Sequence, residues 1–293
     1  MDNRFLIGDQ RNDCVVLCNP DGACGLTEEW VYPLGIDHIA GIKYRQNTLF
    51  GDVILIASGA NSGKAQMISY PEGNLLWSTE QAGNNPHCIE ILPSGNIAVA
   101  ASTGRTVRLF KTAALLSGQP ERADCYDEVP LRAAHGVLWD PKYDVLWALG
   151  DFELNAYRIV GTGIEERLEL CAEMIRPLPE NKMSGHALAA DLTDPDYLYL
   201  TVDSTVFRFD KKAGVFLSDF AGKDRVCRPW VKGLAKNRSG DFVLAVSNGV
   251  FRPWCTDTVL YLKKDGDSFL EQQIHLAETR AIYKVAPFCG SYL

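Results

Sequence analysis

Four of the five histidines in this chain, His38, His87, His135 and His186, are separated by 49, 48 and 51 residues. Each stands immediately before a short apolar segment of the kind that forms a β-strand. This spacing predicts that the four imidazoles occupy one equivalent position in successive repeats. Because neutral imidazole ligates first-row divalent cations and also exchanges protons near neutral pH, the histidines suit either metal binding or acid–base chemistry.

The metal hypothesis takes these four histidines as ligands of Mn, Zn, Ni or Fe, with one coordination position left open for a substrate. Carboxylates would complete the coordination sphere or orient the imidazoles, and the candidates are Asp9, Asp151 and Asp203. Such an ion would polarise a sugar carboxylate or activate water. Two alternatives remain open: the histidines bind a ligand directly, or they belong to a structural hydrogen-bond network.

The elements that would position these side chains repeat with the same period. A turn and a strongly apolar strand follow each of the first five units, at residues 51–58, 95–102, 144–150, 196–203 and 240–247. A third strand with alternating polarity and a more polar fourth strand complete each unit. Repeats of four strands at this period are typical of propeller blades. The sequence therefore predicts an all-β, six-bladed β-propeller.

One domain should cover residues 1–293, and its blades can be bounded from the repeats. The expected blades are 36–83, 84–131, 132–181, 182–223 and 224–279, with a sixth that joins 280–293 to 1–35. In the fifth unit Trp230 takes the place of the histidine. A first strand from the C-terminus and three strands from the N-terminus would close the ring and remove an exposed sheet edge.

The first strand of every blade lines the central channel of a propeller, so the histidines should converge near the axis. The loops between second and third strands should add polar groups on the same side. We expect a small polar molecule such as a carbohydrate to bind there, with a protein as the alternative partner. The predicted ligand-binding residues are Asp9, Gln10, Asn61, Asp151, Asp203, Trp230, Asn248 and Arg280.

Composition narrows the classes of partner. A net charge of −8 and a pI near 5.2 supply no basic field for nucleic acid. No apolar run is long enough to span a bilayer, and the start of the chain lacks a leader-like pattern, so a cytoplasmic location is expected. Nine scattered cysteines indicate reduced thiols rather than a disulfide framework.

Short turn motifs add a resemblance at the level of architecture. The turn at 93–96 and the Asp-Pro turns at 140–141 and 194–195 are similar to those of bacterial six-bladed propellers of the NHL-repeat and gluconolactonase-like kind. The axial histidines resemble the metal site of propeller oligogalacturonate lyases. That resemblance implies a metal-assisted lyase or hydrolase acting on a carbohydrate.

A second resemblance favours a structural role for the histidines. The pair Gly185-His186 is similar to the Gly-His pair of WD-repeat blades. In that family the histidine bonds to an aspartate, which implies that Asp203 pairs with His186 and Asp151 with His135. The competing function is then a non-catalytic propeller that binds its ligand or a protein through one face, with Trp230 and Trp254 either stacking on a sugar or packing between blades.

Overall fold

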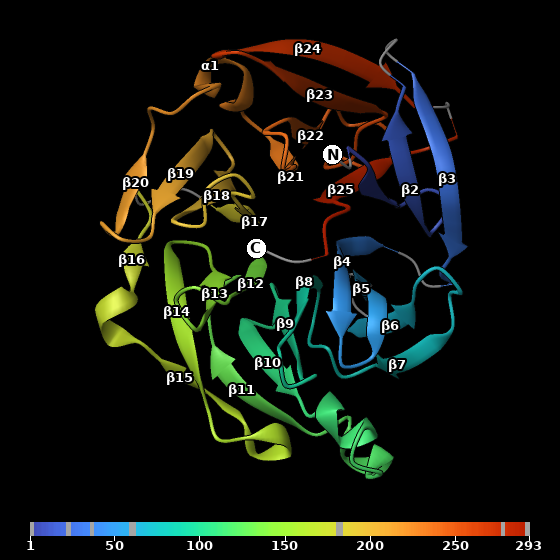
Figure 1. Cartoon of the computed structure of the whole chain (residues 1–293), viewed down its shortest axis with the longest axis vertical. Coiled ribbons are helices and arrows are strands. Elements are labelled where there is room, and N and C mark those ends of the chain that lie inside the picture. The colour runs from blue at the N-terminus through green and yellow to red at the C-terminus, as the bar shows by residue number, and fades with distance from the viewer. Residues whose placement is uncertain are drawn as a thin grey trace.

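The computed structural model describes residues 3–21, 25–35, 38–58, 63–179, 184–276 and 279–290. Its described strands form six antiparallel sheets arranged around a central axis (Figure 1). The predicted all-β, six-bladed propeller is therefore confirmed. No helix in the described ranges is long and apolar enough to cross a membrane.

Each sheet is one blade, numbered here along the chain, with its first strand nearest the axis. Blade 1 contains β25 (Ile282–Pro287), β1 (Phe5–Asp9), β2 (Cys14–Pro20) and β3 (Leu26–Pro33). Blade 2 contains β4 (Ile39–Thr48), β5 (Gly51–Ser58), β6 (Lys64–Ser69) and β7 (Leu75–Thr79). Blade 3 contains β8 (Pro86–Ile91), β9 (Ile97–Ala101), β10 (Thr106–Phe110) and β11 (Tyr126–Pro130).

Blades 4 to 6 follow the same order. Blade 4 contains β12 (Gly136–Asp140), β13 (Val145–Leu149), β14 (Glu153–Val160) and β15 (Arg167–Leu170), with the short β16 (Arg176–Pro177) beside β14. Blade 5 contains β17 (Gly185–Ala190), β18 (Tyr197–Val202), β19 (Val206–Asp210) and β20 (Val215–Leu217). Blade 6 contains β21 (Val231–Lys236), β22 (Phe242–Val246), β23 (Thr258–Asp265) and β24 (Ser268–His275). Short helical turns lie between strands, at η1 (Thr112–Leu115), η2 (Pro120–Arg122), η3 (Gly163–Glu165), η4 (Ala172–Met174) and α1 (Lys223–Val226).

Blade 1 closes the ring in the predicted way. β25 pairs antiparallel with β1, so that Phe5 lies opposite Pro287 and Ile7 opposite Val285. The N-terminal segment then supplies the three outer strands of the same sheet. Pairing with β25 covers the inner edge of β1, which would otherwise be exposed, and this is the physical advantage of the closure.

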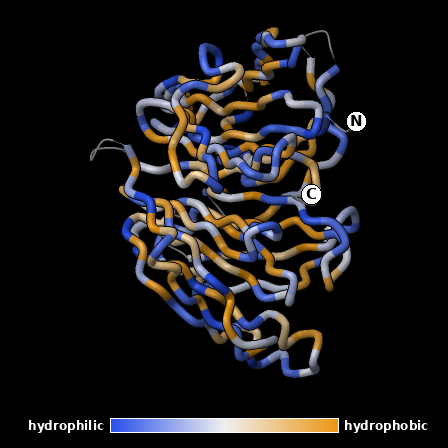
Figure 2. Tube along the Cα trace, turned by 60° about the vertical axis from the view of Figure 1, so that its left-hand side comes forward, coloured by the Kyte–Doolittle hydropathy of each residue, from blue (hydrophilic) through white to orange (hydrophobic). Residues whose placement is uncertain are grey.

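Burial falls from the middle strands of a blade to its outer strand. All five residues of β13 are buried, because this strand is covered on both faces by neighbouring blades. The outer strand β3 instead alternates between partly buried and exposed residues. Hydrophobic stretches recur around the ring in this way (Figure 2), and they form the packed layers between adjacent sheets.

The first strands share a β-bulge that corrects the predicted repeat register. The pairing of β4, β8, β17 and β21 with their second strands skips Ala40, His87, His186 and Lys232, and β25 skips Tyr283. A bulge adds one residue to one strand and redirects its side chain. His38 and Trp230 lie two residues before the skipped position, so the prediction that His38 is equivalent to the other three histidines is wrong.

Backbone conformation supports the corrected register. His38, Asn85, Ala133 and Trp230 all have positive φ, between 45° and 64°. A left-handed residue at the same distance before the first strand in four blades shows that the same kind of turn leads into these four strands. Because Ala133 precedes His135 by two residues, His135 takes the same place as His87 and His186.

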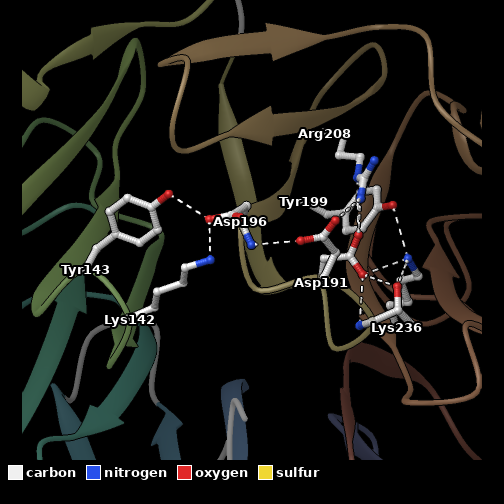
Figure 3. Close-up of polar contacts among 9 residues, drawn as sticks. Lys142, Tyr143, Asp191, Asp196, Tyr199, Arg208 and Lys236 are labelled. Carbon is white, nitrogen blue, oxygen red and sulfur yellow. Dashed lines mark hydrogen bonds and ion pairs between the residues drawn. The ribbon is translucent and has the colours of Figure 1, made fainter.

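Polar contacts between blades hold the opposite end of the first strands. Asp191, which follows β17, accepts from Lys236 of blade 6 at 2.7 Å and from Arg208 at 2.9 Å (Figure 3). Asp196 of blade 5 binds Lys142 and Tyr143 of blade 4, at 2.6 and 2.8 Å. These contacts fix neighbouring blades against each other at the end away from the histidines.

Candidate functional site

An axial layer of polar side chains crosses the central channel. It is formed by one residue from each blade, at the bulge in five blades and at the equivalent position before β12 in blade 4. In ring order these residues are Tyr283, Ala40, His87, His135, His186 and Lys232. We call this set the axial layer. Three successive imidazoles therefore face a lysine and a tyrosine, with alanine leaving a gap in blade 2.

The imidazoles of the layer contact one another directly. The ring centroids of His87 and His135 are 4.3 Å apart, and those of His135 and His186 are 5.2 Å apart at right angles. The His135 Nδ1 lies 2.7 Å from the carbonyl oxygen of Ala133, which requires a proton on that nitrogen. The Tyr283 hydroxyl lies 3.4 Å from His87 Nδ1.

His186 Nε2 lies between an acid and an amine. It is 2.5 Å from Asp203 Oδ1 and 2.6 Å from Lys232 Nζ, and the lysine also donates to Asp203 at 3.1 Å. The expected pairing of His186 with Asp203 is thus present. One nitrogen cannot both donate to the carboxylate and accept from an ammonium, so the protonation states of the three groups are coupled. The hydrogen bond from His186 holds the pKa of Asp203 well below its usual range.

Burial keeps the imidazoles neutral. It lowers the pKa of His135 to about 3, with a further contribution from the adjacent His186. Burial and the neighbouring His135 likewise lower the pKa of His87. At physiological pH these rings are therefore uncharged hydrogen-bonding groups.

The axial layer separates two cavities in the channel. The upper cavity, on the side of the predicted polar loops, has a volume of about 220 Å³ and is lined by Gln10, His38, Ala40, Asn85, His87, His186, Lys232, Trp254 and Tyr283. The lower cavity has a volume of about 70 Å³ and extends from the three imidazoles toward Arg45, Leu192 and Pro287. His87 and His186 contribute to both.

Three of the predicted ligand-binding residues lie at the upper cavity or against its lining. Gln10 is in the wall, where its Oε1 accepts from Trp254 Nε1 at 2.9 Å. Asp203 contacts the lining residues His186 and Lys232. Trp230 is 53% exposed, with its ring 5.1 Å from the Lys232 ammonium, so it is not packed between blades.

The other predicted residues have partners away from the cavity lining. Asp9 is fully buried and accepts from Arg280, which also binds Glu28. These contacts join β1 to the start of β25 and are structural.

Asn248 donates to Asp257 at 2.8 Å. The expected pairing of Asp151 with His135 is wrong, because Asp151 instead forms an ion pair with Arg132 at 3.2 Å. Asn61 lies outside the described residues.

The four histidines do not form the symmetric set that the spacing predicted. His38 lines the upper cavity from the turn before β4, whereas His135 faces the lower one. Within the described ranges, no group of three or more His, Cys, Asp and Glu side chains is arranged to hold a metal ion. A bound Mn, Zn, Ni or Fe ion stays a prediction.

The structure places three residues that the sequence did not predict, Lys232, Tyr283 and Lys284, at or just below the axial layer. Lys284 Nζ donates to the backbone carbonyls of His186 and Lys232, at 3.0 and 2.6 Å. A glycine directly after the axial-layer residue could have identified this position from the sequence. It occurs in three blades, as Ala40-Gly41, His135-Gly136 and Lys232-Gly233. A Cβ at Gly41 would come within 2.7 Å of the His87 carbonyl oxygen, which explains the glycine there.

Residues 47–223, well over half of the chain, match the sequence pattern of the family of unknown function DUF6528. The chain belongs to this family. No curated protein matches the sequence. Membership in DUF6528 therefore identifies the family of this propeller but does not assign it an activity.

Solved structures similar to this DUF6528 member are propellers or proteins of unknown function. A protein of unknown function from Bacteroides caccae is 14% identical, with a TM-score of 0.65 and coverage of 98% of this chain and 99% of that one. The WD40 β-propeller domain of Doa1 is 11% identical, with a TM-score of 0.56 and coverage of 97% and 82%. Virginiamycin B lyase from Staphylococcus aureus is 12% identical, with a TM-score of 0.51 and coverage of 80% and 69%. At these identities the similarity shows the fold alone.

Proposed function

We propose that this protein binds a small anionic sugar, such as a uronic acid, in the upper cavity above the axial layer. The observation that carries the proposal is the lining of that cavity. It combines one ammonium, at Lys232, with amides, imidazoles and the indole of Trp254, and no described carboxylate lines it. Apolar rings with a few convergent polar groups are the usual composition of a small-molecule site.

Aromatic side chains near the upper cavity support a ring-shaped ligand. Trp230, Phe251 and Trp254 are 53%, 48% and 39% exposed. Phe251 is flanked by the guanidinium groups of Arg11 and Arg252, and Arg252 also donates to Gln10 in the cavity wall at 3.0 Å. Exposed aromatic faces of this kind stack on sugar rings, while the nearby cations favour a carboxylate.

Cavity size limits the ligand. A volume of about 220 Å³ is below the roughly 300–1,000 Å³ of pockets that hold drug-sized molecules. A monosaccharide is the expected size, and a longer chain would have to extend past the aromatic side chains into solvent.

Calorimetric titration with glucuronate and galacturonate, against glucose and galactose, tests the proposal. The uronates should bind, Trp254→Ala should weaken them at least tenfold, and Lys232→Met should remove the preference over neutral sugars. Tyr126→Ala is the matched control, because Tyr126 is an exposed aromatic under Arg108 on the outer strand β11. Absence of uronate binding to the wild-type protein at millimolar concentration would overturn the proposal.

Metal-assisted cleavage of the same sugar, by a lyase or hydrolase step, is a second candidate function. Its support is that His87 and His135 are held neutral, the form of imidazole that ligates metals. Elemental analysis of the purified protein tests it, together with the melting temperature before and after chelation. Less than one Mn, Zn, Ni or Fe ion per chain and an unchanged melting temperature would remove this candidate and leave binding.

A further inference from the structure

The lower cavity, on the opposite side of the axial layer, is distinct from the proposed sugar site. Its polar lining consists of Lys43, Arg45, Lys284 and the imidazoles of His87, His135 and His186, and the rest is mainly aliphatic. No carboxylate of a described residue is part of this lining. A small cavity that is lined by cationic side chains favours an anion.

Lys43 and Arg45 have a buried counter-charge, but Lys284 does not. Glu90 accepts from Lys43 at 2.9 Å and from Arg45 at 2.7 Å. Three other buried lysines, Lys211, Lys232 and Lys236, also have carboxylate partners. Lys284 is 6% exposed, and among the described residues its Nζ bonds only to two backbone carbonyls.

A buried ammonium without a counter-charge is costly, so it loses its proton or acquires an anion. Burial, with a smaller contribution from the nearby Lys232, lowers the pKa of Lys284 to about 7. An anion beside Nζ would oppose both effects. The charged and titratable groups around Nζ are Tyr283, whose ring centroid is 4.5 Å away, and Lys232, His186, His87, His135, Cys88, Lys43, Arg45 and Glu90.

We propose that the lower cavity binds a compact oxyanion, phosphate or sulfate in size, and that Lys284 takes up a proton when the anion binds. The cavity of about 70 Å³ is large enough, since one water needs about 10–15 Å³ on the same measure and a tetrahedral oxyanion has five non-hydrogen atoms. Lys284, Lys43 and Arg45 supply donors to its oxygens. The site lies beyond the proposed sugar cavity and does not depend on it.

Sulfate is the best probe, because it does not itself titrate near neutral pH. Calorimetry in two buffers of different ionisation enthalpy should show binding with proton uptake that approaches one per sulfate at pH 8 and falls toward zero at pH 6. Above pH 7 the affinity for sulfate should decrease with pH, and the decrease should approach tenfold per pH unit. Chloride at equal ionic strength should not compete.

Variants of two buried lysines make the test specific. Lys284→Met and Lys284→Gln should each lose at least tenfold in sulfate affinity, and the glutamine keeps a donor for the backbone carbonyls. Lys111→Met is the control, because Lys111 is also buried with a lowered pKa and donates to a backbone carbonyl, that of Glu166, away from the axis.

Several results would overturn the proposal. These are sulfate binding by both Lys284 variants with wild-type affinity, binding by the wild-type protein without proton uptake at pH 8, equal competition by chloride, or no binding. Uronate titration of the same variants separates this site from the upper cavity, since a Lys284 substitution should leave uronate affinity within about threefold.

Discussion

The hydroxyl of Tyr283 lies 3.4 Å from Nδ1 of His87, although a whole blade separates the strands that carry them. The intervening blade contributes only the methyl group of Ala40 at the bulged position. The gap lets a tyrosine from blade 1 reach an imidazole of blade 3. The contact between Tyr283 and His87 therefore depends on one small residue.

Replacing Ala40 with leucine should destabilise the protein by about 1–3 kcal/mol, because Ala40 is 5% exposed and packs against Tyr283, whose ring the larger side chain would displace. It should also separate Tyr283 from His87 and reduce the upper cavity, which Ala40 lines. Chemical denaturation measures the first effect. Tyr283→Phe is the comparison: it removes one long hydrogen bond and should cost no more than about 1 kcal/mol. Equal losses for both variants would contradict the packing argument.

Acid should destabilise the fold through His135. In the unfolded chain this imidazole binds a proton below about pH 6.5, whereas in the folded protein it stays neutral until about pH 3. The unfolded state thus binds more protons between these values, and the free energy of unfolding should fall by up to about 1.4 kcal/mol per pH unit. Above pH 7 the group should contribute no pH dependence.

Urea denaturation of His135→Gln between pH 7 and pH 4 tests this assignment. In this variant, the free energy of unfolding should decrease less steeply as the pH is lowered, because the contribution of His135 is absent. His275→Gln is the control, because His275 lies on the exposed outer strand β24, and its slope should match the wild-type protein. An unchanged slope in His135→Gln would show that another group is responsible.

Glu90→Gln should be among the most damaging single changes in the channel wall. The carboxylate is fully buried and is the ion-pair partner of both Lys43 and Arg45. Loss of its charge breaks both ion pairs, and breaking a buried pair costs about 3–5 kcal/mol. Glu80→Gln removes an ion pair with Lys64 in which Glu80 is 78% exposed, and should change stability by less than about 1 kcal/mol. Thermal and urea unfolding of the two variants gives the comparison.

The fold could be predicted from the sequence because each blade repeats the same local signals. The apolar second strands follow Gly, Asp or Pro turns, and the expected 51–58 strand matches β5 (Gly51–Ser58) residue for residue. Strand polarity, turn residues and period all agree here, so no long-range contact is needed to read the architecture.

The site could be predicted only in part, because it depends on register at the scale of one or two residues. Spacing aligned His38 with His87, but the bulge that both first strands share shows that Ala40, two residues after His38, is at the position of His87. The repeat spacing also aligned Trp230 with the histidines, although Lys232 is the residue at the bulge of the fifth unit. Ion-pair partners such as Asp151 with Arg132 depend on side-chain reach, which spacing does not encode.

Removal of β25 should prevent the ring from closing. A chain that ends at Ala281 loses the inner strand of blade 1, together with Tyr283 of the axial layer and Lys284 of the lower cavity. Strand β1 would then lose its inner pairing partner and β4 would lose its packing against β25, so buried residues such as Ile7 and Ile39 would be exposed at an open edge. We expect no cooperative thermal transition and rapid proteolysis. Truncation after Gly290 is the control and should retain cooperative unfolding. Cooperative unfolding of the shorter chain at the wild-type temperature would show that blade 1 closes without its C-terminal strand.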